Sequence, residues 1–186
     1  MAASSGTTVT INGQNIPLFY VSPTQINGQL PFEIPAGSAS VTVTANNLAG
    51  TAATVSIAPA APGIFLIGAT RAAVTNSDNT VNASSNPAAP GDSITIYFTG
   101  IGPLDHPVPT GQPAPVTGPL SRATLPVIVT IGGQTATISY IGLTPGSISL
   151  AQANVTVPQL ASGDYPVVIQ VGTATSNAPV ITVATR

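Results

Sequence analysis

Of the 186 residues, only three arginines and five acidic residues carry formal charge, and the chain contains no cysteine. Three scattered arginines cannot form the basic stripe that nucleic-acid binding needs, and 43% apolar residues exclude strongly charged disorder. The absence of cysteine excludes disulfides, and no apolar run reaches the ~20 residues that span a bilayer, so we expect no membrane span.

The predicted elements are short β-strands separated by prolines and turn residues, and no segment has convincing helical periodicity. Several strands alternate apolar residues with Thr or Ser, as half-buried antiparallel strands do. The clearest strands, in chain order, are Thr8 to Ile11, Val41 to Thr44, Ile64 to Ile67, Ser93 to Phe98, Val127 to Ile131 and Val167 to Ile169. The sequence therefore predicts an all-β fold.

An internal repeat divides the chain. Val9 to Gln14 recurs as Val129 to Gln134, and both copies contain a Gly-containing dipeptide that favours a type I′ hairpin. Gln25 to Pro31 recurs as Gln152 to Pro158. In each copy an 18-residue strand–turn–strand segment follows, Val41 to Ala58 and Val167 to Ala184.

The two copies differ in what precedes them. Residues 62–126 precede the second copy and supply further strands and a proline-rich loop at 103–119, whereas nothing corresponding precedes the first copy. We therefore predict tandem immunoglobulin-like antiparallel sandwich modules: a partial module of about four strands at 1–60 and a complete one at 61–186. A sheet with one apolar face must cover that face. The partial module requires docking on its neighbour, further upstream sequence or another chain.

Six sequence blocks also resemble a known family. They are Tyr20 to Asn27, Ala61 to Phe65, Asn86 to Asp92, Thr99 to Pro103, Gly142 to Gly146 and Gln152 to Pro158. In this order they resemble the uncharacterised C-terminal domain abundant in secreted proteins of Solibacter-like acidobacteria, whose halves are similar to TIG/IPT-type immunoglobulin-like modules. The resemblance covers about residues 8 to 184. It implies export and a C-terminal position in larger surface proteins, and it carries no known catalytic residues.

The residues that could carry chemistry are few, and each has a structural interpretation. Asp105 and His106 form a pair in the proline-rich loop, but an immediate neighbour is poorly placed to orient a catalytic imidazole. Asn76 to Thr80 contains one carboxylate where calcium needs several, so it predicts a turn. Asp92 is expected to order the turn before its strand, and Glu33 and the aspartates are too scattered for a glycosidase pair. We predict no catalytic, cofactor or metal site.

Aromatic and amide side chains are the remaining candidates for ligand binding. Most of the eight aromatic residues are expected in the core: Phe19, Tyr20, Phe32, Phe65, Tyr97, Phe98, Tyr140 and Tyr165. Tyr20 and Tyr140 occupy equivalent repeat positions, which predicts a shared structural role. The paired amides Gln25 and Asn27, with their equivalents Gln152 and Asn154, are expected to form hydrogen bonds at strand edges.

The sequence favours a non-enzymatic protein. Scarce Lys and Glu with abundant Thr, Ser, Asn, Gly and Pro are typical of an exported protein, and residues 1–6 show no signal sequence, so we expect a mature or excised piece of a bacterial extracellular or cell-surface protein. We expect a structural or adhesive role, with copies of itself or other surface proteins as partners. The weakly charged surface favours self-association.

The sharpest hypothesis is a filament in which the partial module is completed between subunits. The segments expected to expose free edges for this are Ser4 to Thr10, Val41 to Thr44 and Val180 to Thr185. A carbohydrate-binding domain, with aromatic residues on one open face, and a plain spacer in a larger secreted protein are the alternatives.

Overall fold

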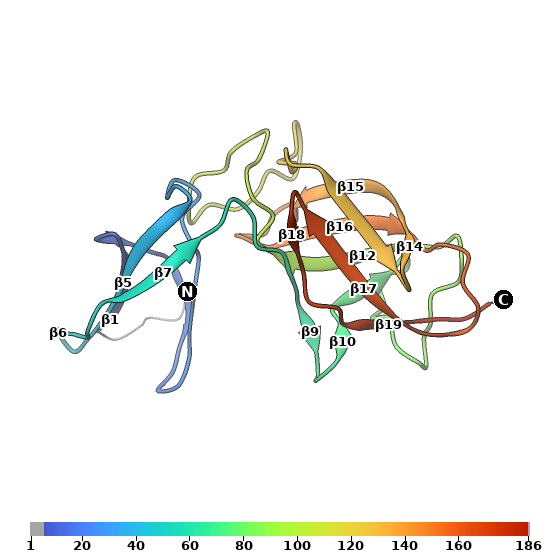
Figure 1. Cartoon of the computed structure of the whole chain (residues 1–186), viewed down its shortest axis with the longest axis horizontal. Coiled ribbons are helices and arrows are strands. Elements are labelled where there is room, and N and C mark those ends of the chain that lie inside the picture. The colour runs from blue at the N-terminus through green and yellow to red at the C-terminus, as the bar shows by residue number, and fades with distance from the viewer. Residues whose placement is uncertain (1–5, 186) are drawn as a thin grey trace. The chain divides into compact units, whose positions relative to one another are not determined.

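The computed structural model describes residues 6–185, and these form an all-β protein without a helical residue (Figure 1). The strand pairs are antiparallel except for one parallel contact, in which Arg71 lies opposite Val180. The prediction of an all-β fold built from antiparallel sheets is confirmed. Among the described residues, no helix has the length and apolar character needed to cross a membrane.

The chain divides into two compact units. The first contains residues 6–59 together with Val108–Gln112, and the second contains Ala60–Pro107 and residues 113–185. From the sequence we predict that the whole proline-rich loop lies in the second module. This prediction is wrong for Val108–Gln112. These residues belong to the first unit because Val108 is buried and the Gly111 amide donates to the side chain of Gln29.

The second unit is a two-sheet sandwich. One sheet has the order β14-β13-β17-β19-β10-β9, with β18 also paired to β17, and the other has the order β11-β12-β16-β15, with β8 also paired to β12. Its strands are β8 (Gly63–Ile64), β9 (Leu66–Ile67), β10 (Arg71–Ala72), β11 (Val74–Asn76), β12 (Ser93–Thr99), β13 (Val127–Ile131), β14 (Gln134–Thr135), β15 (Thr137–Leu143), β16 (Ala151–Thr156), β17 (Gly163–Val171), β18 (Ala174–Thr175) and β19 (Val180–Val183).

This strand order is that of the immunoglobulin fold. In that fold, strands A, B, E and D form one sheet, and strands C, F and G form the other. Here β11, β12, β16 and β15 take the places of A, B, E and D, and β13, β17 and β19 take those of C, F and G. Figure 1 shows β12, β16 and β15 beside one another in the second unit. The apolar side chains of β12 (Ile94, Ile96 and Phe98) are fully buried in the core.

The first unit repeats part of this plan. Its larger sheet has the order β2-β1-β5-β6 with β7 paired to β5, and β3 and β4 form a separate two-stranded sheet. Its strands are β1 (Thr7–Ile11), β2 (Gln14–Asn15), β3 (Leu18–Val21), β4 (Ile26–Gly28), β5 (Gly37–Ala45), β6 (Leu48–Ala49) and β7 (Ala53–Ile57). Thus β1, β5 and β7 correspond to C, F and G, and β3 and β4 correspond to D and E.

Local details recur in both copies. The two-residue turns Asn12-Gly13 and Gly132-Gly133 have positive φ at both positions, as a type I′ hairpin requires. A β-bulge interrupts β3 between Leu18 and Tyr20, and another interrupts β15 between Ile138 and Tyr140. The repeat in the sequence is therefore a repeat of backbone structure.

Strands A and B are the parts without a counterpart in the first unit. Within residues 6–59 and 108–112, no strand pairs with β4 on the side where β12 pairs with β16, and none pairs with β7 where β10 pairs with β19. The described residues of the first unit thus form the C, D, E, F and G strands of an immunoglobulin-like module. The second unit contains all seven.

Candidate functional site

The apolar face of the first unit is the most distinctive surface in the described chain. Val43 is 38% exposed and Val55 is 40% exposed, whereas their repeat equivalents Ile169 and Ile181 are both 0% exposed. Val41 and Ile57 lie beside them on β5 and β7 and are only half-buried. We call Val41, Val43, Val55 and Ile57 the open face. Inner faces of a sandwich are normally covered by the opposite sheet. Val9 and Ile11, which lie opposite Val43 and Val41 in the β1–β5 register, are buried, so the open face is the part of this inner face that the described residues leave uncovered.

Two strand edges border the missing strands. β4 pairs only with β3, and β7 pairs only with β5, within the described residues. We call the unpaired side of β4 the open edge. Proteins usually protect an edge strand with charge, proline or a covering element. β4, β5 and β7 contain no charged residue and no proline, so their sequences provide none of this protection.

The edges expected from the sequence are largely wrong. Val41 to Thr44 lies in β5, which pairs with β1 on one side and with β6 and β7 on the other. Val180–Val183 is β19, which pairs with β17 and contacts β10. β5 and β19 are therefore paired on both sides, and neither exposes the free edge that the sequence predicts. Thr7 to Thr10 belongs to β1, paired along its length with β5, while residues 4 and 5 lie outside the described residues.

Tyr20 and Tyr140 do not share an environment. Tyr140 is 8% exposed, and its hydroxyl donates to the carbonyl of Leu143 at 2.7 Å, while the Arg122 guanidinium lies 4.7 Å from its ring centre. Tyr20 is 49% exposed. The predicted shared structural role is therefore wrong. Arg122, from the loop before β13, packs on the Tyr140 ring, and no equivalent residue contacts Tyr20 among the described residues.

The paired amides do recur as pairs. Gln25 Nε2 donates to Asn27 Oδ1 at 2.7 Å, and Gln152 Nε2 donates to Asn154 Oδ1 at 2.9 Å. The second pair is partly buried, and Asn154 also accepts a hydrogen bond from Thr95 of β12. The first pair is exposed beside Tyr20, which lies opposite Asn27 in the β3–β4 register. An exposed ring and an exposed amide pair therefore lie side by side on the β3–β4 sheet.

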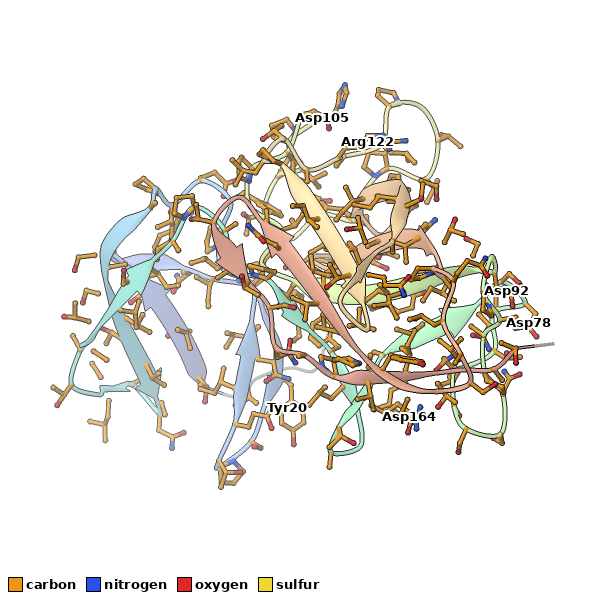
Figure 2. The ribbon with its side chains drawn as sticks, turned by 45° about the vertical axis from the view of Figure 1, so that its right-hand side comes forward. Tyr20, Asp78, Asp92, Asp105, Arg122 and Asp164 are labelled. Carbon is orange, nitrogen blue, oxygen red and sulfur yellow. The ribbon has the colours of Figure 1, made fainter. Side chains whose placement is uncertain are left out.

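Asp105 and His106 lie in the loop that leads toward Arg122, and Figure 2 shows Asp105 and Arg122 close together. From the sequence we expect Asp105 to be poorly placed to contact the imidazole of its immediate neighbour. In the structure, however, Asp105 Oδ1 lies 3.1 Å from His106 Nδ1. The same oxygen accepts the backbone amides of His106 and Arg122. The Arg122 amide is the main cause of a lowered pKa of the Asp105 carboxyl. Both side chains are exposed, and their contact is a local one within this loop.

The acidic loops of the second unit are turns. Asp78 Oδ1 accepts both the amide and the hydroxyl of Thr80, and the hydroxyl bond is the main cause of a lowered pKa of Asp78. Asp92 Oδ2 accepts the Ala89 amide directly before β12, which confirms its predicted role in that turn. Within residues 6–185, no group of three His, Cys, Asp or Glu side chains could hold a metal ion. Figure 2 shows Asp78 and Asp92 in this part of the second unit.

A polar contact inside the first unit joins the loop segment Val108–Gln112 to the end of the β3–β4 sheet. The Thr110 hydroxyl donates to Glu33 Oε2 at 2.6 Å, and the Gly111 amide donates to Gln29 Oε1 at 2.8 Å. The Thr110 hydroxyl is the main cause of a lowered pKa of Glu33. We call these two contacts the loop clasp. Gln29 Nε2 is buried and has no partner among the described residues.

Comparisons with known proteins leave the family open. No protein-family model matches the sequence, and no curated protein is similar to it, so the resemblance to the acidobacterial domain stays a prediction. A Bacteroides ovatus surface protein, the mixed-linkage glucan utilization locus SGBP-B in complex with a heptasaccharide, is 16% identical with a TM-score of 0.34. The match covers 96% of this chain and 37% of that structure.

Domains 4 and 5 of the S-layer protein SbsC are 17% identical, with a TM-score of 0.26, over 99% of this chain and 73% of theirs. Both TM-scores lie below 0.5, and nothing about binding by this chain follows from either match.

The repeat itself is a sequence signal that points to the open face. The repeat offsets make Val43 equivalent to Ile169 and Val55 equivalent to Ile181, so these positions can be compared in the two copies. Individual apolar runs, in contrast, do not indicate which strand edges are free. The open edge of β4 was missed because Ile26–Gly28 is too short to give a strand signal of its own.

Proposed function

We propose that this protein is a non-enzymatic structural or adhesive module of the cell exterior, and that a further polypeptide segment covers the open face of its first unit. The observation that carries the proposal is the contrast between Val43 and Val55, which are more than one-third exposed, and their fully buried equivalents Ile169 and Ile181. Apolar surface of this kind is stabilised when a partner removes it from water. Export and surface location are supported by the composition alone.

The filament hypothesis needs a donor strand from a second copy. β12 is the strand whose equivalent is missing, but it lies between β11 and β16 with fully buried apolar side chains. A second copy could release it only by opening its own sandwich, and β19 is likewise held on both sides. We therefore propose that the covering segment is neither β12 nor β19 of a second copy, and self-assembly is an outcome that the experiment distinguishes.

Site-specific photocrosslinking in the producing cells tests this function. A benzoylphenylalanine residue at Val43 is expected to crosslink one discrete polypeptide, identified by sequencing of the crosslinked peptide. The matched control is the same residue at Ile128, which is also exposed but lies on β13 of the complete unit. A crosslinked dimer of this chain would establish self-assembly. No discrete crosslink at Val43, or equal capture at Ile128, would overturn the proposal.

Carbohydrate binding is the second candidate function, and Tyr20 with the exposed Gln25–Asn27 amide pair favours it. Aromatic rings and amides together provide the stacking surface and hydrogen bonds that sugars use. Pull-down on insoluble polysaccharides with wild type and Tyr20→Ala tests it, with Phe65→Ala, an exposed ring of the second unit, as control. Retention that depends on Tyr20 alone would support glycan binding. Equal retention of all three proteins would exclude this site.

A further inference from the structure

We propose that Asn27 is a site of spontaneous deamidation, at which the Gly28 amide nitrogen attacks the side-chain amide and the asparagine becomes aspartate or isoaspartate. The tetrapeptide Ile-Asn-Gly-Gln occurs twice in the chain, at residues 11–14 and 26–29. Asparagine before glycine favours this reaction because glycine has no side chain beside the attacking nitrogen. Since the two tetrapeptides are identical, the fold must account for any difference in rate between them. The inference is independent of the proposed function.

The fold holds the first tetrapeptide in a geometry that opposes the reaction. Asn12 lies in the type I′ turn between β1 and β2, with a φ of 51°. Its amide donates to the Ser40 carbonyl at 2.8 Å, and its Oδ1 accepts the Ser40 amide at 2.9 Å. Attack by the Gly13 nitrogen requires the Asn12 backbone and side chain to rotate, and these rotations break the bonds to Ser40.

In the second tetrapeptide, the attacking nitrogen is not bonded to the neighbouring strand. Asn27 and Gly28 are both exposed on β4. The Gln25 carbonyl and the Gln29 amide, on either side of them, bond to the residues that flank β3. In an antiparallel pair, the backbone groups of alternate residues point to opposite edges of the strand. The Gly28 amide therefore points away from β3, which does not hold it.

The sheet also restrains Asn27 weakly. In the described part of the chain, β3 and β4 form a two-stranded sheet, and the β-bulge between Leu18 and Tyr20 lies opposite Asn27. Two-stranded pairs are marginally stable and open locally at low free-energy cost. Such an opening allows the Asn27 backbone to rotate until the side chain reaches the Gly28 nitrogen.

A hydrogen bond already polarises the group that is attacked. Gln25 Nε2 donates to Asn27 Oδ1 at 2.7 Å. Attack on the side-chain carbon places negative charge on this oxygen, and a donor that is in place before the reaction stabilises that charge. Asn12 Oδ1 accepts instead from a backbone amide that its own rotation would leave behind.

The reaction needs water and no other reagent. A bond forms between the Gly28 nitrogen and Asn27 Cγ, the bond from Cγ to Nδ2 breaks, and the proton of the Gly28 amide leaves with the nitrogen as ammonia. Water then opens the resulting succinimide ring at either of its two carbonyls. Opening at the backbone carbonyl gives isoaspartate, and opening at the side-chain carbonyl gives aspartate, with no change in oxidation state.

Packing explains why a glycine follows Asn27. A Cβ atom at position 28 would lie 2.9 Å from Ile16 Cδ1 and 3.0 Å from the Pro17 carbonyl oxygen, which is closer than ordinary van der Waals contact. The repeat equivalent Asn154 is followed by Val155, whose branched side chain hinders approach to its nitrogen. Asn154 also lies in β16, which pairs on both sides. The reactive pair therefore belongs to the first copy of the repeat.

Deamidation at Asn27 would change the first unit more than its size suggests. Glu33 is the one charged side chain in the described part of this unit, so the product carboxylate adds a second negative charge, opposite Tyr20 in the register of β3 and β4. Isoaspartate also adds a carbon atom to the backbone of β4 and shifts its pairing with β3. The exposed surface formed by Tyr20 and the amide pair would thus age irreversibly.

The test compares the two identical tetrapeptides within one molecule. Folded full-length protein is incubated at mildly alkaline pH, and the peptides that contain Asn12 and Asn27 are quantified by mass spectrometry. We expect Asn27 to lose its amide at least tenfold faster than Asn12 in the folded protein, and the two rates to become similar in concentrated urea. Equal rates in the folded protein, or faster loss at Asn12, would overturn the inference.

Two further readouts test the chemistry. The Asn27 product should be a mixture of aspartate and isoaspartate, whereas aspartate alone would show direct hydrolysis and contradict attack by Gly28. Gln25→Met removes the donor to Asn27 Oδ1 and should slow the reaction at Asn27 several-fold without changing the rate at Asn12. An unchanged rate at Asn27 in Gln25→Met would contradict the contribution of this hydrogen bond. Asn27→Gln should abolish the reaction at this position, because its longer side chain would have to close a less favourable six-membered ring.

Discussion

The two copies of the repeat share a backbone plan but differ in how completely their cores are closed. Both contain the type I′ hairpin and the bulged strand, at Leu18/Tyr20 and at Ile138/Tyr140. The second copy buries its inner face because β12 and its neighbours cover it, and the first copy leaves Val43 and Val55 exposed. The comparison teaches that local sequence determines turns and bulges, whereas burial depends on strands distant in the chain.

The largest expected difference between the copies concerns core truncation. Ile169→Ala removes a fully buried side chain, and a loss of about 2–5 kcal/mol in the free energy of unfolding of the second unit is expected. The equivalent change in the first unit, Val43→Ala, should alter stability by no more than about 0.5 kcal/mol. Urea denaturation, followed by resolved amide signals from each unit, measures both. Similar losses would show that the first unit has a closed core.

A second prediction concerns the polar network that fixes the start of the complete module. Asn82 is fully buried, its Nδ2 donates to the Thr182 carbonyl, and its Oδ1 accepts the Thr182 amide. Asn82→Ala should cost about 1–3 kcal/mol, because it leaves the Thr182 amide of β19 without its acceptor, while the Thr182 carbonyl keeps the Ala88 amide as a donor. The exposed Asn27→Ala is the matched control and should be near neutral. The same denaturation experiment measures both variants. An unchanged free energy of unfolding in Asn82→Ala would contradict the role of this polar network.

The tyrosine pair gives a smaller effect. Tyr140→Phe removes the hydrogen bond to the Leu143 carbonyl and should destabilise the second unit by about 0.5–1.5 kcal/mol. Burial, the main perturbation, raises the pKa of Tyr140. Tyr20→Phe should leave stability unchanged because the ring is half exposed. A spectroscopic titration of wild type and Tyr140→Phe should assign a raised pKa to Tyr140. A titration curve at high pH that Tyr140→Phe leaves unchanged would contradict the buried environment of this ring.

The smallest expected effect concerns pH and the loop clasp. The pKa of Glu33 is lowered in the folded protein. Its contribution to the stability of the folded state is therefore fully present above the ordinary pKa of 4.5, and it is lost as the pH falls through the lowered pKa. The amide signal of Thr110 should therefore shift as the solution becomes acidic. Glu33→Gln should abolish that shift, while Asp78→Asn, in the second unit, should leave it intact. If the Thr110 amide signal still shifts with pH in Glu33→Gln, the shift does not arise from protonation of the Glu33 carboxylate.

The fold class was predictable because it depends on local patterns. Alternating runs such as Ser93–Thr99 and the Asn12-Gly13 turn indicate strands and hairpins directly. The assignment of Val108–Gln112 to the first unit was not predictable, since it depends on contacts with Glu33 and Gln29 that lie 77 and 82 residues away in the chain. Likewise, the environment of Tyr140 depends on Arg122, which lies outside the repeated segments.

Amide hydrogen exchange of the full-length protein alone tests most directly whether the first unit is an incomplete module. Exchange from a poorly covered sheet proceeds through local opening at low free-energy cost. The account predicts that β5 and β7 exchange at least a hundredfold faster than their equivalents β17 and β19, under conditions in which both units remain folded. Equal protection of the two pairs of strands would mean that the first unit is already closed, and it would contradict the open face on which the proposed function depends.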